Sequence, residues 1–454
     1  VNFGKASYID KARQQPDKVK MVLDKALSDG VIPTLNSVRS KLAQPIPLGY
    51  SNVGIVQDVS PNISIFKPGD RVVSNGTHAD VVTVKKNLCA IIPNNVDDDS
   101  AAFTVVGSIA LQGVRLAQPS LGEAFVVFGA GLIGLLTIQI LRAAGCRVLA
   151  VDLDEDKLKL AKKFGAETCN PLMGGSIFTQ ANIFSRERGV DGIIITASSQ
   201  SNEIIKQSAQ VSRKRGRIIL IGVVGLDLDR SDFYEKELNF QVSCSYGPGR
   251  YDPSYEDDGI DYPIEHVRWT EQRNFEAFLD MLAVGSVDVK ALISTRFDFD
   301  NAPDAYNALT GDSSLLGILL DYKSNPSERL VETINLKNRH IINKHKTIEN
   351  YPTLGFIGAG NYASRVLIPA FKKAGASLHT LVSANGVNSA IHGKKMGFIN
   401  CSTDMSSVLE NPEIDTIIIA TQHDTHANYV VDALNARKNV WVEKPLAIDF
   451  EGLS

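Results

Sequence analysis

Residues 125–152 read FVVFGAGLIGLLTIQILRAAGCRVLAVD, and this stretch sets the architecture of the first part of the chain. It contains, in order, an apolar strand, a glycine turn, an uncharged helix, a second apolar strand and a carboxylate. Gly129, Gly131 and Gly134 form a G-x-G-x-x-G pattern between the predicted strand and the predicted helix. That context favours a dinucleotide-binding fingerprint over a chance match. An ordinary buried βαβ unit is the alternative.

Each residue of this turn has an expected role. Gly129 makes the tight turn, Gly131 lets the backbone approach a pyrophosphate, and Gly134 lets the helix pack on the strand. The helix then presents free N–H groups to the phosphates, with Leu132 and Ile133 in its first turn. Asp152 follows the second strand, about 20 residues after the last glycine, where an acid binds a ribose 2′-hydroxyl. We therefore expect NAD in this domain.

The bulk composition limits the classes of function. With 454 residues the chain is too long for one ordinary core, so we expect two or three domains. A net charge of -4 gives no electrostatic reason to expect a nucleic-acid partner. The longest uncharged run, 125–141, is too short to span a membrane. The five cysteines are scattered without a C-x-x-C, which argues against a disulfide framework or a zinc lobe and fits a reducing cytoplasm.

Before the fingerprint, the pattern predicts a helix over 11–27 and then a small β-rich module. Its strands are expected at 53–56, 70–73 and 79–84, followed by a helix over 100–116 with Ser100 as its cap. After the fingerprint, strands and helices alternate to about residue 322, which predicts a parallel sheet with helices on both faces. The basic run 213–217 is expected to complement the end of a helix. Two further helices, 275–282 and 302–309, are expected to return towards the β-rich module.

A charged, polar segment, 323–352, is the predicted linker. Beyond it the strand–turn–helix pattern restarts as Gly358-Ala359-Gly360-Asn361-Tyr362-Ala363, with Ala in place of the last glycine. Alternating strands and helices continue to residue 442. The chain therefore carries two predicted nucleotide folds in tandem.

Residues 1–322 resemble the medium-chain dehydrogenase/reductase superfamily. The resemblance lies in the order of segments 47–54 (PLGYSNVG), 68–72 (PGDRV), Ala101-Ala102, the fingerprint, and 216–222 (GRIILIG), whose last residue Gly222 implies a cofactor contact. Where zinc-dependent members have His and Glu, this chain has Tyr50 and Ser51, and where they have a later Cys it has Thr104 or a neighbour. A catalytic zinc needs three protein ligands, and the nearby His78 supplies one, so we expect no zinc. Without a metal, a hydroxyl must polarise the substrate, and Tyr50 and Ser108 are the candidates.

Residues 353–454 resemble the N-terminal half of the glucose-fructose oxidoreductase / inositol dehydrogenase family. The resemblance lies in 358–363, in 420–426 (ATQHDTH) and in 442–445 (VEKP). It implies that Lys444 lies near the nicotinamide and the substrate, and that the cofactor is contacted by Thr421, His423, His426 and Glu443. His423 and His426 have an equal claim to a capping role at a helix start. Ser383 stands where the ribose acid is expected, so NAD and NADP both remain open here.

The tandem itself resembles bacterial bi-domain oxidoreductases, a group associated with sugar and polysaccharide metabolism. The tract 244–253 (CSYGPGRYDP) looks characteristic of that group. It follows a predicted strand, where α/β enzymes place ligand-binding residues. Tyr246, Arg250 and Tyr251 are therefore candidate substrate residues, with a plain Gly/Pro-rich loop as the alternative.

These observations predict an α/β protein. We expect a partial GroES-like β-rich module over 1–118 that also receives about 275–322, a Rossmann domain over 119–274, the linker, and a second Rossmann domain over 353–454. This last domain would stop before the C-terminal substrate domain of its family, so the chain reads as a fragment.

The expected function is zinc-independent, NAD(P)-dependent hydride transfer to or from a sugar, sugar derivative or nucleotide sugar, by a cytoplasmic homo-oligomer with no membrane partner. Two alternatives are a dinucleotide-binding scaffold with impaired catalysis, and a quinone-reductase-like activity in the first domain.

Overall fold

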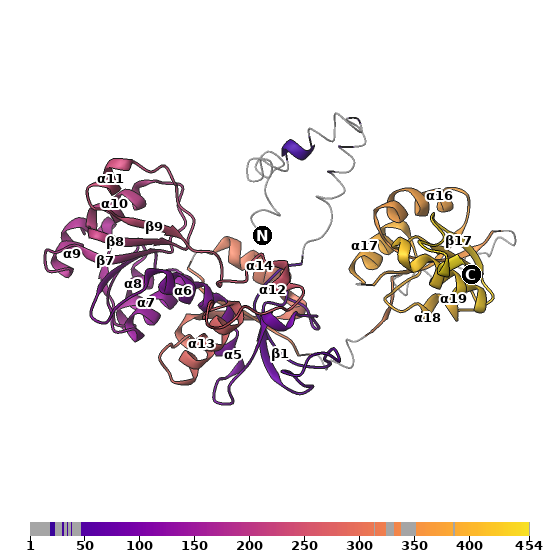
Figure 1. Cartoon of the computed structure of the whole chain (residues 1–454), viewed down its shortest axis with the longest axis horizontal. Helices are drawn as coiled ribbons and strands as arrows, with labels where there is room; N and C mark the ends of the chain where they lie inside the picture. Colours follow the sequence, from indigo (N-terminus) through magenta and orange to yellow (C-terminus); the bar gives the residue numbers. More distant parts are fainter. Residues whose placement is uncertain are drawn as a thin grey trace. The chain divides into compact units, whose positions relative to one another are not determined.

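The computed structural model describes residues 19–22, 30, 34, 38, 47–312, 314–323, 331–336, 351–384 and 386–453 (Figure 1). Most of the helix predicted over 11–27 lies outside these residues. The chain divides into two compact units, Val1–Ser324 and Asn325–Ser454, and each is described by itself.

A six-stranded parallel sheet forms the centre of the first unit, in the order β6-β5-β4-β7-β8-β9. Its strands are β4 (Ala124–Phe128), β5 (Arg147–Val151), β6 (Glu167–Cys169), β7 (Val190–Ile195), β8 (Ser212–Leu220) and β9 (Asn239–Val242). Strand β4 is buried along its whole length, which is why its sequence is uncharged. The predicted parallel sheet is confirmed.

Helices cover both faces of this sheet (Figure 1). Phe125 and Val127 pack with α6 (Thr104–Ala117) and α7 (Leu132–Ala143) on one face. Val126 and Phe128 pack with α9 (Ile177–Phe184) and α10 (Glu203–Val211) on the other. Alternate side chains of one strand therefore serve two cores. The short helices α8 (Glu155–Lys163), α11 (Arg230–Tyr234) and α12 (Pro253–Glu256) complete this part.

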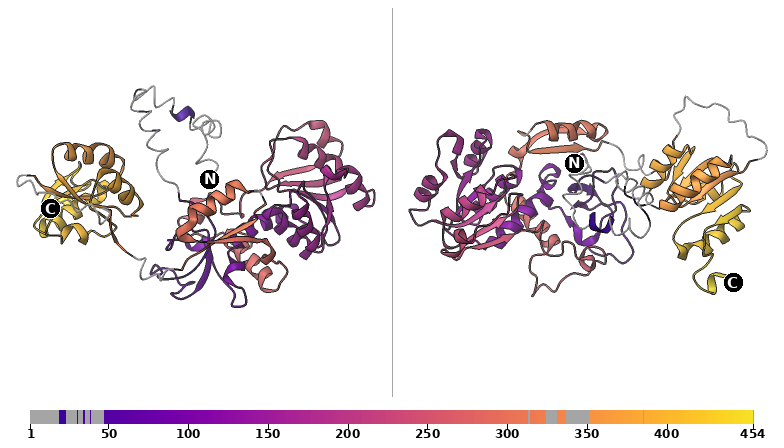
Figure 2. Two further views of the ribbon diagram at one scale, coloured as in Figure 1. Left: turned by 180° about the vertical axis from the view of Figure 1, so that it is seen from behind. Right: turned by 90° about the horizontal axis from the view of Figure 1, so that it is seen from above.

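The β-rich module is an antiparallel sheet of β1 (Asn52–Ile55), β2 (Arg71–Ser74) and β3 (Cys89–Ile91). The segment from α13 (Glu271–Ala283) to β11 (Gly317–Asp321) returns to the β-rich module. Figures 1 and 2 show this salmon-coloured segment beside the indigo strands. Phe275 and Leu279 of α13 pack with Val73 and Ala90. The parallel pair β10 (Ile293–Asp298) and β11, with α14 (Ala302–Gly311), completes the unit.

Two expectations for the module are wrong. Residues 79–84 form no strand, and the sheet of the module consists of β1, β2 and β3. The helix expected over 100–116 is two helices, α5 (Asp98–Ala101) and α6, and Ser100 lies inside the first. Its cap is Asp97, whose carboxylate accepts from the Ser100 backbone N–H at 2.8 Å.

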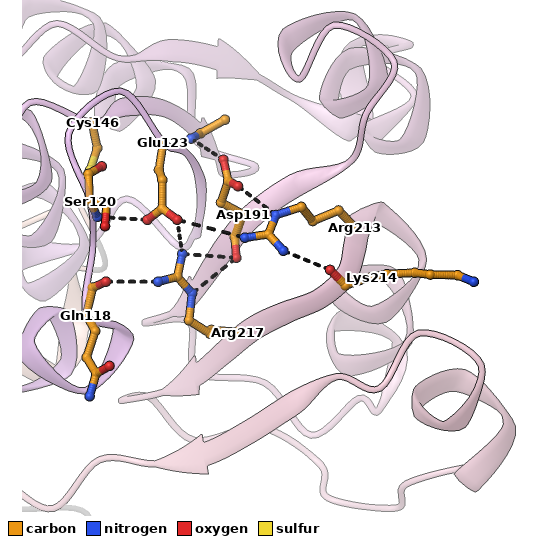
Figure 3. Close-up of polar contacts among 9 residues, drawn as sticks. Gln118, Ser120, Glu123, Cys146, Asp191, Arg213, Lys214 and Arg217 are labelled. Atoms are coloured by element: carbon orange, nitrogen blue, oxygen red, sulfur yellow. Dashed lines mark hydrogen bonds and ion pairs between the residues drawn. The ribbon is translucent and has the colours of Figure 1, made fainter.

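The basic run 213–217 also has a different role from the one expected. It lies within β8, and its arginines pair with carboxylates at the amino-terminal edge of the sheet (Figure 3). Arg213 Nε lies 2.7 Å from Asp191 Oδ1, and Arg217 Nη2 lies 2.6 Å from Glu123 Oε1. The end of α10 is instead capped by Lys236, whose Nζ donates to the carbonyls of Ala209, Gln210 and Ser212. A cation does serve this helix terminus, but it comes from a distant segment.

The second unit is another six-stranded sheet, in the order β12-β15-β14-β13-β16-β17. Its strands are β12 (Thr333–Asn335), β13 (Thr353–Ile357), β14 (Ser377–Val382), β15 (Asn400–Ser402), β16 (Thr416–Ile419) and β17 (Asn439–Val442). All pairs are parallel except β12 with β15. Strand β12 lies inside the predicted linker, so that segment contributes an edge strand.

The helices of the second unit follow the predicted alternation. A π-helical turn over Ala363–Leu367 leads into α16 (Ile368–Lys373), followed by α17 (Val387–Met396), α18 (Ser406–Leu409) and α19 (His426–Asn435). Within the part of either unit that the structure describes, no helix combines the length and the apolar character needed to cross a membrane.

Candidate functional site

The first glycine turn has the geometry that a dinucleotide needs. Gly129 adopts φ +94°, and its N–H donates to Val151 O at 2.8 Å. A Cβ on Gly131 would meet no atom within 4 Å, so the backbone there is open to a ligand. A Cβ on Gly134 would lie 1.8 Å from Gly129 O, so helix α7 packs directly on the turn. The three glycines therefore fit a pyrophosphate-binding turn.

Asp152 stands at the end of β5 beside this turn. Its Oδ2 accepts from the Ala130 N–H at 2.6 Å, and its Oδ1 accepts from the Asp154 N–H at 2.9 Å. The carboxylate is thereby held at the carboxyl edge of the sheet, where a ribose hydroxyl would bind.

Other residues near the turn are placed as follows. Leu132 and Ile133 are half-buried in the first turn of α7. Gly222 follows β8, and a Cβ there would lie 2.1 Å from Ala197 O. The sequence reasoning missed Thr196, whose Oγ1 donates to Gly129 O at 2.7 Å. Thr196 follows β7, the neighbour of β4 where the strand order reverses, and that position was the available signal.

A cavity of about 1020 Å³ lies where the β-rich module, the first turn of α7 and the returning segment meet. Tyr50 and Ser51 line it, and Leu132 brings the glycine turn to the same space. Other lining residues include Leu48, Gly49, His78, Asp98, Asp99, Val106, Tyr306, Leu309, Asp321, Tyr322 and Lys323. A cavity large enough for a small molecule therefore adjoins the predicted cofactor turn.

The two hydroxyl candidates have different positions. Tyr50 lines the cavity with 53 % of its surface exposed. Ser108 is fully buried in α6, and its Oγ donates to Thr104 O at 2.8 Å. Ser108 does not line the cavity, and its catalytic role stays a prediction from the sequence. Thr104 is buried as well, and its neighbour Val106 reaches the cavity.

His78, considered above as a single possible zinc ligand, has a hydrogen-bond partner in this cavity. His78 Nδ1 lies 2.6 Å from the hydroxyl of Tyr306, a residue of α14. Burial lowers the pKa of His78 and raises the pKa of Tyr306, so both groups are held neutral. No local pattern announced this pair, because its members are 228 residues apart.

The carboxylates of the cavity are engaged by arginines. Asp98 lies 2.5 Å from Arg71 Nη2, and Asp321 lies 3.4 Å from Arg296 Nη1. Asp99 also pairs with Arg296. Among the described residues, no group of three or more His, Cys, Asp or Glu side chains could hold a metal ion.

The tract 244–253 lies outside the described cavity lining. Tyr246 is buried in the core of the β-rich module, and Tyr251 is 72 % exposed. Arg250 lies between their rings, with Cζ at 5.4 Å and 4.2 Å from the two centroids, and it pairs with Glu256. The structure therefore brings the three candidate substrate residues together around one guanidinium, but away from Tyr50.

The second unit repeats the geometry of the turn. Gly358 adopts φ +108°, and its N–H donates to Val382 O at 2.9 Å. A Cβ on Gly360 would meet no atom within 4 Å, while Ala363 is buried in place of the third glycine. Asn361 and Tyr362 are exposed at the turn. Ser383 Oγ accepts from the Ser389 N–H at 3.2 Å and thus serves the start of α17.

The remaining predicted residues of this unit gather beside the turn. His426 is buried, and its Nδ1 lies 2.8 Å from Pro445 O, next to Lys444. Its Nε2 lies 3.4 Å from Thr421 O, so His426 joins the two motifs. His423 and Lys444 are exposed, and Glu443 is half-buried. His426 thus positions neighbouring backbone, and His423 and Lys444 face solvent.

Two family models match the chain. Residues 133–284 match "Zinc-binding dehydrogenase", and residues 353–454 match "Oxidoreductase family, NAD-binding Rossmann fold". The first unit thus carries a domain like that of zinc-binding alcohol dehydrogenases, and the second carries an NAD-binding domain of the glucose-fructose oxidoreductase / inositol dehydrogenase type. The chain is an NAD(P)-dependent oxidoreductase with two dinucleotide-binding domains, as the sequence predicted.

Individual relatives match the first unit. D-xylulose reductase A of Aspergillus oryzae is 25 % identical over 301 residues, 58 % of this chain and 77 % of the relative. D-arabitol-phosphate dehydrogenase of Enterococcus avium is 22 % identical over 321 residues, 63 % of this chain and 83 % of the relative.

Two solved structures share the fold. Galactitol-1-phosphate dehydrogenase from Escherichia coli has a TM-score of 0.52 and 20 % identity, and the match covers 61 % of this chain and 86 % of that one. 2R,3R-butanediol dehydrogenase from Bacillus subtilis has a TM-score of 0.50 and 22 % identity, with coverage of 61 % and 80 %. Both similarities support the architecture of the first unit.

Proposed function

We propose that the first unit transfers hydride between NAD and a sugar alcohol or its carbonyl counterpart, without zinc. The observation that carries this proposal is the cavity that joins Tyr50 and His78 to Leu132 of the glycine turn. A dinucleotide bound with its pyrophosphate at this turn would provide the nicotinamide that accepts or supplies the hydride. The polyol and sugar relatives named above favour a substrate with several hydroxyl groups.

The lining of the cavity supports the zinc-free part of the proposal. Tyr50 and Ser51 of the lining, with Thr104 or a neighbour, stand where the resemblance would place the zinc ligands, and the carboxylates of the lining pair with arginines. Ser51 Oγ donates to Ala102 O at 2.7 Å, so its proton is already engaged. The "Zinc-binding dehydrogenase" match covers 133–284, which includes none of these residues. A zinc site would need three protein ligands, and His78 is the only imidazole in the described lining.

Without zinc, polar side chains must polarise the substrate's oxygen. Tyr50 and the Tyr306 hydroxyl present donors to a substrate oxygen, and apolar residues such as Leu309 exclude water beside them. Asp152 favours NAD over NADP, because a carboxylate accepts from a ribose 2′-hydroxyl and repels a 2′-phosphate.

For the second unit we propose NAD or NADP binding with Lys444 beside the reacting oxygen. The tandem arrangement then corresponds to that of bacterial bi-domain oxidoreductases. Homo-oligomerisation and a cytoplasmic location stay predictions from the sequence.

The test uses the full chain, purified without added metal. Zinc is measured by elemental analysis, and reduction of NAD⁺ is followed with a panel of polyols and polyol phosphates. Turnover of a polyol by protein with far less than one zinc per chain is the expected result. Stoichiometric zinc would overturn the zinc-free assignment. Tight NADH binding without turnover of any polyol or sugar would instead favour the dinucleotide-binding scaffold.

A further inference from the structure

The His78–Tyr306 pair was not among the predicted catalytic residues, yet its placement is that of a functional pair. Both side chains line the cavity, and they approach from different parts of the chain, the β-rich module and α14. The Nδ1–Oη distance of 2.6 Å is short for a nitrogen–oxygen hydrogen bond. The two rings are tilted by 38° with their centroids 6.0 Å apart, so the contact is made through the polar atoms.

The surrounding backbone is shaped to hold the imidazole. The His78 N–H donates to Leu48 O at 2.7 Å, which joins the loop after β2 to the segment before β1. Gly49 adopts φ +89°, and a Cβ there would lie 2.2 Å from His78 Cδ2 and 2.4 Å from Nε2. A side chain at 49 would therefore displace the ring. Glycine at this position is required both by the backbone and by the close approach of the imidazole.

The electrostatic surroundings suit a neutral proton carrier. Tyr322 lines the same cavity, and its pKa is raised to about 12, chiefly by burial and then by the charge of Asp80 and by Tyr306. Tyr50 is the other phenol of the lining. The other titratable groups of the cavity lining are Tyr50, Tyr322, Asp98, Asp99, Asp321 and Lys323, and Asp80 acts on Tyr322 through its charge.

We propose that Tyr306 and His78 form a relay that carries the substrate's hydroxyl proton to and from solvent during hydride transfer. This role rests on the proposed function. In the oxidation of an alcohol, the C–H bond breaks and its electron pair leaves as hydride to the oxidised nicotinamide. The substrate O–H proton passes to Tyr306 Oη while the phenol proton passes to His78 Nδ1, and a C=O bond forms. The imidazolium then releases one proton to solvent. Reduction of the carbonyl runs the same steps in reverse.

The test compares the full chain with Tyr306→Phe and His78→Asn. Removing the relay lowers kcat/KM for polyol oxidation by about 100-fold or more. In the wild type, kcat/KM falls towards acidic pH as His78 takes up a proton, and we expect this acidic limb to disappear in His78→Asn. Matched controls are Tyr234→Phe and His266→Asn, which change exposed residues outside the cavity lining and should leave kcat/KM unchanged.

A second readout does not depend on turnover. In ¹⁵N-histidine-labelled protein saturated with NADH, addition of a polyol should move the ring-nitrogen resonances of His78, and Tyr306→Phe should abolish this response. A purely structural histidine would not respond to the polyol.

The outcomes separate the two proposals. If the wild type oxidises a polyol but Tyr306→Phe keeps its kcat/KM and its pH profile, the proton relay is wrong and the proposed function stands. If the wild type binds NADH but neither turns over a polyol nor shows the His78 response, both fail.

Discussion

Two carboxyl groups of the first unit, those of Glu271 and Asp152, differ in how deeply they are buried. Glu271, the first residue of α13, is fully buried, and burial together with the neighbouring Glu256 raises its pKa to about 8. Asp152 lies half-buried, and its carboxylate accepts hydrogen bonds from two backbone N–H groups. Glu271 is thus suited to packing as a neutral acid. Asp152 is placed to accept a hydrogen bond from a ligand hydroxyl.

Glu271 predicts a pH-dependent stability. Because its pKa is raised in the folded state, its contribution to stability is fully present below the ordinary pKa of 4.5 and is lost as pH rises through about 8. Glu271→Gln resembles the neutral acid, so its melting temperature should match that of the wild type near pH 5. Above pH 8 it should exceed the wild type by several degrees, since about 1.4 kcal/mol is at stake per pH unit. Scanning calorimetry measures this, with exposed Glu265→Gln as the control; equal pH dependence in the two variants would contradict it.

Asp152 predicts the choice of cofactor. Asp152→Ala removes the carboxylate that would accept from the ribose hydroxyl and repel a 2′-phosphate, so the preference for NADH over NADPH should fall about tenfold or more. Fluorescence titration with both cofactors measures the ratio. Asp156→Ala, at an exposed site in α8, is the matched control. An unchanged ratio in Asp152→Ala would refute the assignment.

Within the βαβ element, two glycines of the same turn serve different purposes. A Cβ at Gly131 would face open space, whereas a Cβ at Gly134 would meet Gly129 O and Thr196 Oγ1. The first contributes to ligand access and the second to the packing of α7 on β4.

The two positions therefore predict opposite phenotypes. Gly131→Ala should keep the melting temperature and weaken NADH binding at this site, because a methyl group fills the space meant for the pyrophosphate. Gly134→Ala should lower the melting temperature by several degrees, because its Cβ would lie 1.8 Å from Gly129 O and the helix must shift. Calorimetry and NADH titration on both variants separate the effects. Loss of stability in Gly131→Ala alone would reverse the assignment.

In the whole molecule, two compact units present the same ligand-binding geometry. Gly131 and Gly360 are both open, and Gly129 and Gly358 both have positive φ. Each turn lies at the point where the order of its sheet reverses, between β4 and β7 or between β13 and β16.

This repetition predicts two NADH sites per chain. Calorimetric titration of the full chain should give a stoichiometry near two, and Gly131→Ala and Gly360→Ala should each reduce it to near one. The double variant should bind none. A stoichiometry of one in the wild type with NADH and with NADPH together, lost in only one of the single variants, would show that a single turn is functional.

The sequence by itself determined the features that depend on neighbouring residues. Hydrophobic periods and glycine spacing were sufficient to predict the parallel strands of both sheets, both turns and the position of Asp152, because each βαβ unit is set within about 30 residues. They predicted a strand over 79–84 that the structure does not contain, and they did not predict β12, which forms by pairing with the edge of β15.

Only the tertiary structure decided which distant groups meet. It brought His78 to Tyr306 across 228 residues, paired Arg217 with Glu123, and buried Ser108 away from the cavity. Such contacts depend on how whole elements pack, and no periodicity in the chain encodes them. The cofactor turn could therefore be predicted from the sequence. The proposed proton relay could not, because His78 and Tyr306 meet only where α14 packs beside the β-rich module.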